Sequence, residues 1–403
     1  SNTTDGATAV LAGNITGVDA IVLNDVTPGA DATITTGAYT LDATFVKSMS
    51  VDASSLDAGE DFTFGGSSSV TRMDITAGAG NDSLTLGTIA DTVDAGAGND
   101  TVVGTSGGNN ISLGAGNDSL TAGTGNEVVD GGAGNDTFNL DGNLNSGDSI
   151  DGGAGTDTLI ISSGISTASV LGGSSNLEII TETGANTITA NASLGGASVF
   201  NFSDDDNQTL TLTSAAAGGT YDQAVTVYLS YGTAHDDTNA DVITNSKGVA
   251  LNVIGDADTF DANTTITGSA TGVDTITVIA DADGTGATFA AMTYIDKVVV
   301  QDSATAGEDV IITPRATDAT TPLLTVDATQ LDSGTGTAQE TLKLVGTSVT
   351  VTKLDVTGGG GNDSLYGGQK NDTLEGGVGI DSINGNEGAD SLSGGAGNDI
   401  FLV

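Results

Sequence analysis

The chain has 403 residues, enough for two or three compact domains, but its composition is unusual for a soluble enzyme. Glycine occurs 61 times, and 53 Asp and Glu stand against 8 Lys and Arg, which gives a formal net charge of −45. This charge excludes partners bound through the phosphate backbone of nucleic acid, and it excludes anionic membrane surfaces. An acidic excess of this size repels itself unless cations enter the folded structure, and Ca²⁺ is the first candidate.

Cysteine is absent, so disulfides, thiolate metal sites and thiol nucleophiles are excluded. The single histidine, His235, stands in the polar stretch YGTAHDDTN and is interpreted as a surface-loop residue rather than a catalytic base. No apolar run is long enough to span a membrane, and no secretory signal pattern is visible at the first residues. The sequence stops inside a repeated block, so we expect a fragment of a longer protein.

From Ala77 onward the sequence repeats every nine residues. Blocks such as AGAGNDSLT and GGAGNDTFN follow one another up to Ile160, and a second run extends from Gly358 to Leu402. The sixth position of the block is acidic in all copies but one, and the residue two positions later is always apolar. The sixth positions are Asp82, Asp91, Asp100, Asn109, Asp118, Glu127, Asp136, Asp148 and Asp157 in the first run, and Asp363, Asp372, Asp381, Asp390 and Asp399 in the second.

This period predicts a coil with two turns and two short strands. Six Gly-rich residues suit a turn because glycine adopts positive φ, and a Ser/Thr-apolar-polar triplet suits a strand whose middle side chain points inward. Two blocks close one coil, and successive coils stack by backbone pairing about 4.8 Å apart. Acidic side chains one coil apart then lie above one another, where Ca²⁺, which prefers oxygen ligands, turns their repulsion into attraction. The alternative is a turn array that binds no ion.

The blocks resemble the GGxGxDxUx nonapeptides of RTX (repeats-in-toxin) proteins, which form calcium-loaded parallel β-rolls. The resemblance implies that each ion lies between two loops one coil apart. Its ligands would be the second, fourth and sixth positions of one loop and the first, third and sixth positions of the next, with backbone carbonyl oxygens at every position except the sixth. In the first run the implied ligands are Gly78, Gly80 and Asp82 with Ala95, Ala97 and Asp100; Gly96, Gly98 and Asp100 with Leu113, Ala115 and Asp118; and Gly114, Gly116 and Asp118 with Gly131, Ala133 and Asp136. In the second run they are Gly359, Gly361 and Asp363 with Gly376, Val378 and Asp381; Gly368, Lys370 and Asp372 with Gly385, Glu387 and Asp390; and Gly377, Gly379 and Asp381 with Gly394, Ala396 and Asp399.

Alternate loops of the first run depart from this pattern. LGTIAD, GTSGGN and AGTGNE have lost glycines or the acid itself, and all three fall on one edge of the predicted roll. We therefore expect several structural Ca²⁺ ions on the edge of Asp82, Asp100, Asp118 and Asp136, extending to Asp157. The edge of Asp91, Asn109 and Glu127 is expected to be largely empty.

The rest of the chain predicts further β-structure. Short alternating stretches such as DTITVIAD and TLTLTS lack helical periodicity, so the fold class is all-β, with parallel β-rolls alternating with solenoid or sandwich segments. The predicted organisation is an N-terminal β-rich segment (1–76), a first roll (77–160), a middle β-rich region (161–357) and a second roll (358–403). The segment that begins at Val51 is similar to the one at Val326, and each runs directly into a roll.

The Thr/Ala/Val-rich texture beside RTX blocks resembles bacterial surface-layer proteins exported by type I secretion. This resemblance implies a secreted, non-enzymatic structural protein on the outer face of a Gram-negative envelope, which folds and self-assembles with Ca²⁺. Its partners would be further copies of itself, and cell-surface polysaccharide through parts not present here. A segment of an RTX adhesin that binds a glycan or another surface is the alternative.

An enzyme is the third hypothesis. Residues 104–108 match GxSxG, but they stand in the repeat register rather than at a strand-to-helix turn, so Ser106 is not expected to be a nucleophile. The acidic clusters at 204–206 and 281–283 are interpreted as solvated loops rather than as paired glycosidase carboxylates.

Overall fold

The computed structural model describes the strands and most loops of the two rolls, and the strands of the remaining segments. The residues described are 8–11, 20–23, 32–36, 48–66, 72–140, 143–162, 169–170, 174–183, 187–190, 199–202, 209–212, 224–229, 241–246, 249–256, 260, 264–270, 272–280, 286–288, 291–301, 310–314, 323–331, 340–346, 349 and 352–402. Over these ranges the chain is all-β, as predicted, and no helix is long and apolar enough to cross a membrane.

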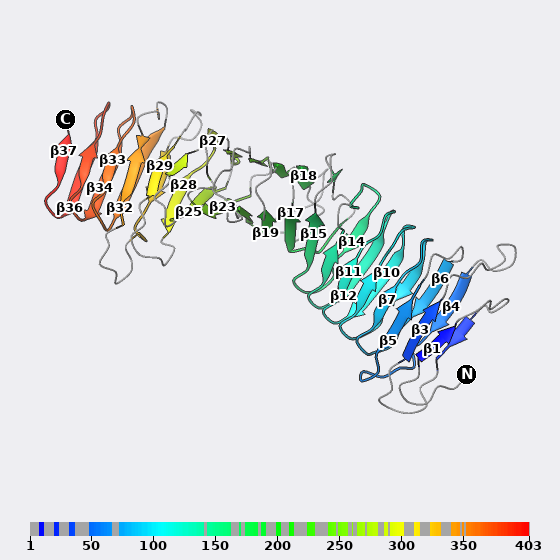
Figure 1. The fold of residues 1–403 in the computed structure, drawn as a ribbon. Helices are drawn as coiled ribbons and strands as arrows, with labels where there is room; N and C mark the ends of the chain where they lie inside the picture. Colours follow the sequence, from blue (N-terminus) through cyan, green and yellow to red (C-terminus); the bar gives the residue numbers. More distant parts are fainter. Residues whose placement is uncertain are drawn as a thin grey trace. The chain divides into compact units, whose positions relative to one another are not determined.

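The chain forms two compact units, and each is a stack of parallel β-coils (Figure 1). The first unit comprises Ser1–Thr183, Thr189–Ala197 and Ala215–Thr220, and the second comprises Gly184–Ile188, Ser198–Ser214 and Tyr221–Val403. Each unit contains one of the two repeat runs. The finer division into four segments stays a prediction.

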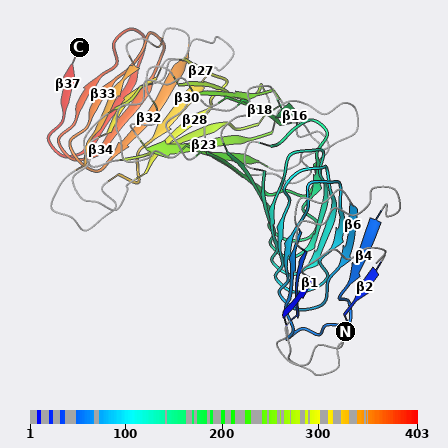
Figure 2. The same cartoon turned by 45° about the vertical axis from the view of Figure 1, so that its right-hand side comes forward.

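The first unit has two walls of parallel strands, which Figure 2 separates. One wall consists of β1 (Thr8–Leu11), β3 (Ala32–Thr36), β5 (Phe62–Gly65), β7 (Ser83–Thr85), β9 (Thr101–Val103), β11 (Ser119–Thr121), β13 (Thr137–Asn139), β15 (Thr158–Ser162) and β17 (Ile179–Thr183). The other wall consists of β2 (Ala20–Val22), β4 (Ser48–Asp52), β6 (Arg72–Thr76), β8 (Thr92–Asp94), β10 (Asn110–Ala115), β12 (Val128–Ala133) and β14 (Ser149–Asp151). Strands β16 (Ser169–Val170) and β18 (Thr187–Ala190) follow in the chain.

The second unit is built in the same way. Its longest wall consists of β19 (Val199–Phe202), β21 (Val225–Leu229), β23 (Leu251–Asp256), β25 (Thr275–Ile279), β28 (Lys297–Gln301), β30 (Leu323–Asp327), β32 (Lys353–Gly359), β34 (Thr373–Val378) and β36 (Ser391–Ala396). Two shorter ladders complete its coils: β20 (Thr209–Leu212), β22 (Val242–Asn245), β24 (Thr265–Thr267) and β27 (Ala291–Thr293), and then β26 (Gly286–Thr288), β29 (Val310–Thr313), β31 (Leu342–Val345), β33 (Ser364–Tyr366), β35 (Ser382–Asn384) and β37 (Ile400–Leu402).

The middle region continues the solenoid, which decides between the two architectures that the sequence left open. Val298 of β28 lies opposite Val326 of β30, Val326 opposite Val356 of β32, and Val356 opposite Leu374 of β34. The ladder therefore passes from the middle region into the second roll without a change of register. The described non-repeat strands are coils of the same solenoid rather than sandwich domains.

The core of the first roll is a narrow column of apolar side chains. Leu84, Val102, Leu120, Phe138 and Leu159 come from one wall, and Ile75, Val93, Ile111, Val129 and Ile150 come from the other; all are at most 3% exposed. Parallel pairing places Leu120 against Phe138 and Phe138 against Leu159. Apart from Ile75, which precedes the first block, each stands two residues after a sixth position, so the predicted inward orientation is confirmed.

The two similar segments occupy equivalent places, one coil before each roll. The N–H of Leu56 donates to the carbonyl of Ala53 at 3.0 Å, and the N–H of Leu331 donates to that of Ala328 at 3.0 Å. In each copy the leucine is buried. The similarity in sequence therefore reflects one kind of coil on which a roll begins.

Phe138→Ala should lower the free energy of unfolding by about 3–5 kcal/mol, because its side chain is fully buried between Leu120 and Leu159. Thr137→Ala in the same strand faces outward and should change it by less than about 0.5 kcal/mol. Chemical unfolding with saturating calcium measures both. Equal losses for the two variants would contradict this assignment of the core.

Candidate calcium-binding loops

Loops of the first roll form two edges between the walls. The first edge consists of the loops that end at Asp82, Asp100, Asp118, Asp136 and Asp157, each of which leads into a strand of the β7–β17 wall. The second edge consists of the loops that end at Asp91, Asn109, Glu127 and Asp148. These are the two sets that the nine-residue period predicts.

Sixth-position carboxylates form a hydrogen-bonded ladder along the first edge. One oxygen, Oδ1, accepts the N–H of the sixth residue one coil earlier: Asp82 donates to Asp100 at 2.7 Å, Asp100 to Asp118 at 2.7 Å, and Asp118 to Asp136 at 2.8 Å. The N–H of Asp136 donates to Asp157 at 2.8 Å. These two residues are 21 rather than 18 positions apart, because the sequence carries three extra residues between Asp136 and Asp148. The second roll repeats the arrangement from Asp363 to Asp381 at 2.8 Å and from Asp381 to Asp399 at 3.1 Å.

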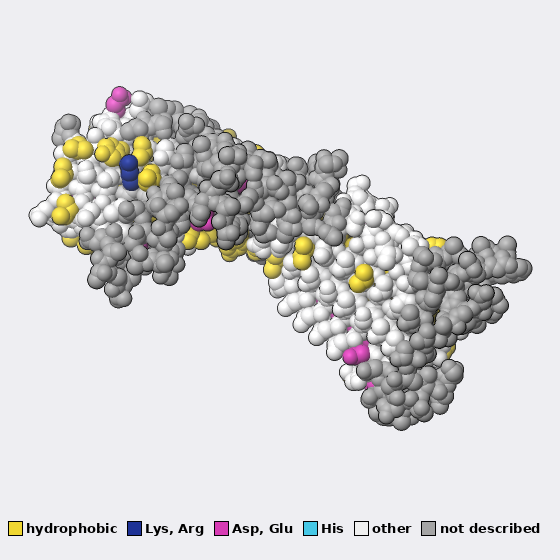
Figure 3. All heavy atoms as spheres, in the orientation of Figure 1, with side chains coloured by type: hydrophobic (Ala, Val, Ile, Leu, Met, Phe, Trp, Pro, Cys, Tyr) yellow, Lys and Arg dark blue, Asp and Glu magenta, His cyan; other side chains and the backbone are white. Residues whose placement is uncertain are grey.

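The other oxygen, Oδ2, is buried without a hydrogen-bond partner in a row of these carboxylates. The row contains Asp100, Asp118, Asp136 and Asp157 in the first roll, and Asp381 shows the same feature in the second. The first-roll residues of the row are at most 2% exposed. Few Asp and Glu side chains of the described residues appear on the face drawn in Figure 3.

Burial of these carboxylates disfavours their charged form. Burial is the main cause that raises the pKa of Asp100 to about 7, and the carboxylates of Asp82 and Asp118 add to the effect. Burial likewise raises the pKa of Asp136 to about 6, with Asp118 and Asp157 nearby. A group of anions held in this way is stabilised in its charged form by a cation.

Glycines bring the backbone carbonyls of the same loops close to the next coil. The second and fourth positions have positive φ in Gly96 and Gly98, Gly114 and Gly116, Gly132 and Gly134, Gly153 and Gly155, Gly359 and Gly361, Gly377 and Gly379, and Gly395 and Gly397. Where the next loop repeats the pair, the carbonyl of one glycine faces the corresponding glycine of the next coil. The approach is so close that a Cβ added to Gly116 would overlap the oxygen of Gly98. Only glycine allows both this φ and this approach.

The donor set fits Ca²⁺. No three His, Cys, Asp or Glu side chains within the described ranges lie close enough to hold a metal ion. An ion between two first-edge loops would therefore take two carboxylates and complete its shell with the glycine and alanine carbonyls. An all-oxygen shell of this kind suits calcium rather than zinc or copper. The orphaned Oδ2 atoms are the observation that supports this fit.

The structure brings the implied pairs of loops together in the stack, but two loops differ in detail. In loop 77–82 the N–H of Gly78 donates to Oδ2 of Asp82 at 3.0 Å, and in loop 367–372 the N–H of Gly368 donates to Oδ2 of Asp372 at 2.6 Å. Neither Gly78 nor Gly368 has positive φ. In these two loops a backbone N–H of the loop itself therefore already bonds the second carboxylate oxygen. The ions implied at Asp82 with Asp100, and at Asp372 with Asp390, stay predictions.

A second ladder, made by fifth-position asparagines, was not assigned from the sequence. The side-chain oxygen of Asn81 accepts the N–H of Asn99 at 2.7 Å, Asn99 accepts that of Asn117 at 2.7 Å, and Asn117 accepts that of Asn135 at 2.7 Å. It runs in the opposite sense to the carboxylate ladder, since each oxygen reaches the following coil. The recurring Asn-Asp pair in AGAGND, LGAGND and GGAGND is the signal that could have revealed it.

The remaining sequence candidates add no site. Ser106 of the GxSxG match lies in a second-edge loop, where its hydroxyl donates to the carbonyl of Thr88 at 3.1 Å. His235 and the acidic clusters at 204–206 and 281–283 lie outside the described residues.

Comparison with known families identifies the repeats. The family profile described as the RTX calcium-binding nonapeptide repeat, which spans four copies, matches residues 74–102, 103–138, 145–167, 355–374 and 366–401, about a third of the chain. The comparisons with curated proteins and with solved structures found no match. The matched segments contain both the carboxylate ladder and the positive-φ glycines.

Gly116→Ala should destabilise the first roll by more than about 2 kcal/mol, because it combines an unfavourable φ of 143° with overlap on the Gly98 carbonyl. Gly59→Ala is the matched control, since nothing lies within 4 Å of its added Cβ, and it should be neutral or slightly stabilising. Thermal unfolding at saturating calcium compares them. A neutral Gly116→Ala would contradict the loop geometry.

Proposed function

Because the chain belongs to the RTX family of calcium-binding β-roll proteins, we propose that it is a calcium-dependent extracellular structural protein that folds and self-assembles with Ca²⁺ as a surface-layer subunit. The observation that carries the calcium requirement is the row of buried, unpartnered carboxylate oxygens from Asp100 to Asp157. No donor among the residues that the structure describes forms a hydrogen bond with these atoms. A divalent cation in each gap offsets the cost of burying them.

The proposed ions lie between successive loops that share the positive-φ glycine pair. In the first roll these gaps separate loops 95–100, 113–118, 131–136 and 152–157, and in the second roll they separate loops 358–363, 376–381 and 394–399. Each gap is bordered by two sixth-position carboxylates that are linked through the ladder. One carboxylate then contributes to two neighbouring ions, so occupation of one gap fixes the geometry of the next.

This arrangement couples folding to the calcium concentration outside the cell. Without calcium, a stack of buried carboxylates opposes coil closure, and the narrow core offers limited compensation for the lost chain entropy. Extracellular calcium modules bind at about 10⁻⁴–10⁻³ M, above cytosolic levels. The calcium-binding edges would therefore stay open during export and close on the cell surface.

A structural role is supported by the outer faces of the coils. In strands β5 to β13 of the wall that contains β7–β17, the register aligns one outward-facing hydroxyl residue per strand: Thr63, Ser83, Thr101, Ser119 and Thr137. Such a regular polar column suits repeated contacts between copies. The serine of the GxSxG match, Ser106, donates its hydroxyl to the carbonyl of Thr88 in the preceding coil, so its contacts give no support for a catalytic role. An adhesin segment remains the competing outcome.

A titration with calcium, and with magnesium as control, tests this proposal through circular dichroism and light scattering. β-structure should increase with calcium near 10⁻⁴–10⁻³ M and large ordered assemblies should follow, whereas magnesium should produce neither change because it requires a small octahedral shell. Folding to a monomer would favour the adhesin alternative and contradict self-assembly. Equal responses to both cations, or to neither, would contradict the calcium requirement.

A further inference from the structure

The second edge of the first roll contains carboxylates and loop carbonyls like those of the first edge, but protein donors already engage them. We infer that protein donors take the place of calcium along this edge, mainly backbone N–H groups at the carboxylates and side-chain hydroxyl and amide groups at the loop carbonyls, so that Asp91, Asn109, Glu127 and Asp148 form a metal-independent seam. The inference rests on the proposed calcium binding at the first edge. Beyond the proposed function, the inference states which residues keep calcium from the second edge and which hydrogen bonds stabilise that edge.

Both oxygens of each carboxylate in the seam accept hydrogen bonds. Asp91 accepts the N–H of Met73 at 2.7 Å and that of Gly87 at 3.1 Å. Glu127 accepts the N–H of Asn109 at 2.7 Å and its side-chain amide at 3.4 Å. Asn109 in turn accepts the N–H of Asp91 at 2.9 Å, which places a neutral amide between two acids.

At the C-terminal end of the seam, both oxygens of Asp148 also accept hydrogen bonds. Asp148 accepts the N–H of Glu127 at 2.8 Å through Oδ1 and the N–H of Asn145 at 2.7 Å through Oδ2. None of the seam carboxylates has the buried, unpartnered oxygen that marks Asp100, Asp118, Asp136 and Asp157. The charge that a cation would balance is therefore already solvated by N–H donors.

Side chains also occupy the loop carbonyls of the seam. The hydroxyl of Thr105 donates to the carbonyl of Gly87, and that of Ser106 donates to Thr88 at 3.1 Å. Farther along, the side-chain amide of Asn145 donates to the carbonyl of Gly125 at 2.5 Å. First-edge loops have only Gly or Ala at the second, third and fourth positions from loop 95–100 to loop 152–157, so they have no such donors.

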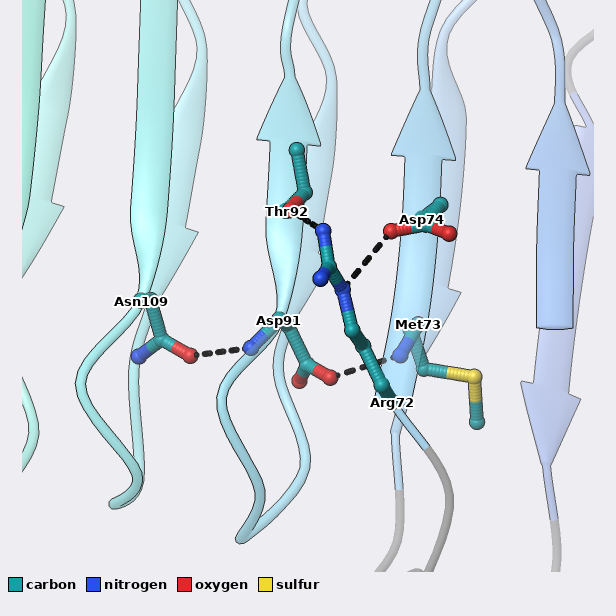
Figure 4. A network of polar contacts seen from close by, with 6 residues as sticks. All are labelled: Arg72, Met73, Asp74, Asp91, Thr92 and Asn109. Atoms are coloured by element: carbon teal, nitrogen blue, oxygen red, sulfur yellow. Dashed lines mark hydrogen bonds and ion pairs between the residues drawn. The ribbon is translucent and has the colours of Figure 1, made fainter. Parts of the chain in front are cut away.

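At the N-terminal end of the seam, near Asp91, Arg72 supplies a positive charge. Arg72 pairs with Asp74 at 3.0 Å and donates to the hydroxyl of Thr92, and the lower part of its side chain runs past Asp91 (Figure 4). The seam thus begins with a fixed positive charge, continues through an amide and ends in the Asn145 loop. It spans the coils that the first edge spans with unpartnered carboxylates.

The consequence is an asymmetric roll. One edge requires calcium, and the other keeps adjacent coils in register before calcium arrives. We therefore expect the seam to retain protected amides when calcium is removed, and to act as the template on which the first edge closes.

Matched amide variants in the full chain test which edge binds ions. Asp118→Asn and Glu127→Gln each remove one buried charge from neighbouring sixth positions, and both keep a side-chain oxygen for the ladder bond. Bound calcium is counted by equilibrium dialysis, with circular dichroism to confirm that each variant is folded. Asp118→Asn should lose up to two ions, because Asp118 borders two gaps, and Glu127→Gln should lose none.

Amide exchange of the unmodified chain gives a readout that needs no variant. In excess chelator, the N–H groups of Asp91, Asn109 and Glu127 should exchange at least about tenfold more slowly than those of Asp100 and Asp118. The double change Thr105→Val and Ser106→Ala should make these three N–H groups exchange about tenfold faster in chelator. It should leave the number of bound calcium ions unchanged.

The outcomes separate the two claims. If no calcium binds to the unmodified chain, the proposed function fails. If calcium binds but Glu127→Gln loses as many ions as Asp118→Asn, or if both edges exchange equally fast in chelator, the seam is wrong while calcium binding stands.

Discussion

Burial of stacked carboxylates is the constraint on which the rest of this structure depends. Coils stack about 4.8 Å apart, and two carboxylates about 5 Å apart repel by roughly 3 kcal/mol at an effective dielectric constant of 20. A solenoid that places an acid at the same loop position in every coil would accumulate this repulsion. In the ladder, a main-chain N–H group donates to one oxygen of each acid. The other oxygen accepts from further protein donors on the second edge, and on the first edge we propose that calcium binds it.

The narrow core explains why the second oxygen matters. Each coil of the roll contributes only a few large apolar side chains, such as Ile111, Leu113 and Leu120, so its apolar burial leaves little surplus over chain entropy. The loop edges must therefore contribute to stability rather than merely connect strands. Glycine at the second and fourth positions allows loop carbonyls to approach the next coil closely, and the proposed calcium ions depend on this geometry.

The repeat itself predicted most of the rolls. The position of the acid fixed the position of the inward residue, as Leu120 follows Asp118 and Phe138 follows Asp136, because both follow from the pleat of a three-residue strand. The middle region lacks a fixed period, so only the observed register of Val298, Val326 and Val356 distinguishes a solenoid from a sandwich. The Asn81 ladder, the Gly78 N–H bond to Asp82 and the Thr105 and Asn145 bonds were not predictable from single blocks, because each joins residues in different coils or depends on one φ value.

The most direct measurement of the central claim is the anomalous-difference density of crystals grown with calcium. The account predicts a row of ions in the gaps between loops 95–100, 113–118, 131–136 and 152–157, and no peak among Asp91, Asn109 and Glu127. Peaks of equal height on both edges would contradict the division of the roll into a calcium edge and a hydrogen-bonded seam. Density on neither edge would contradict the role of calcium itself.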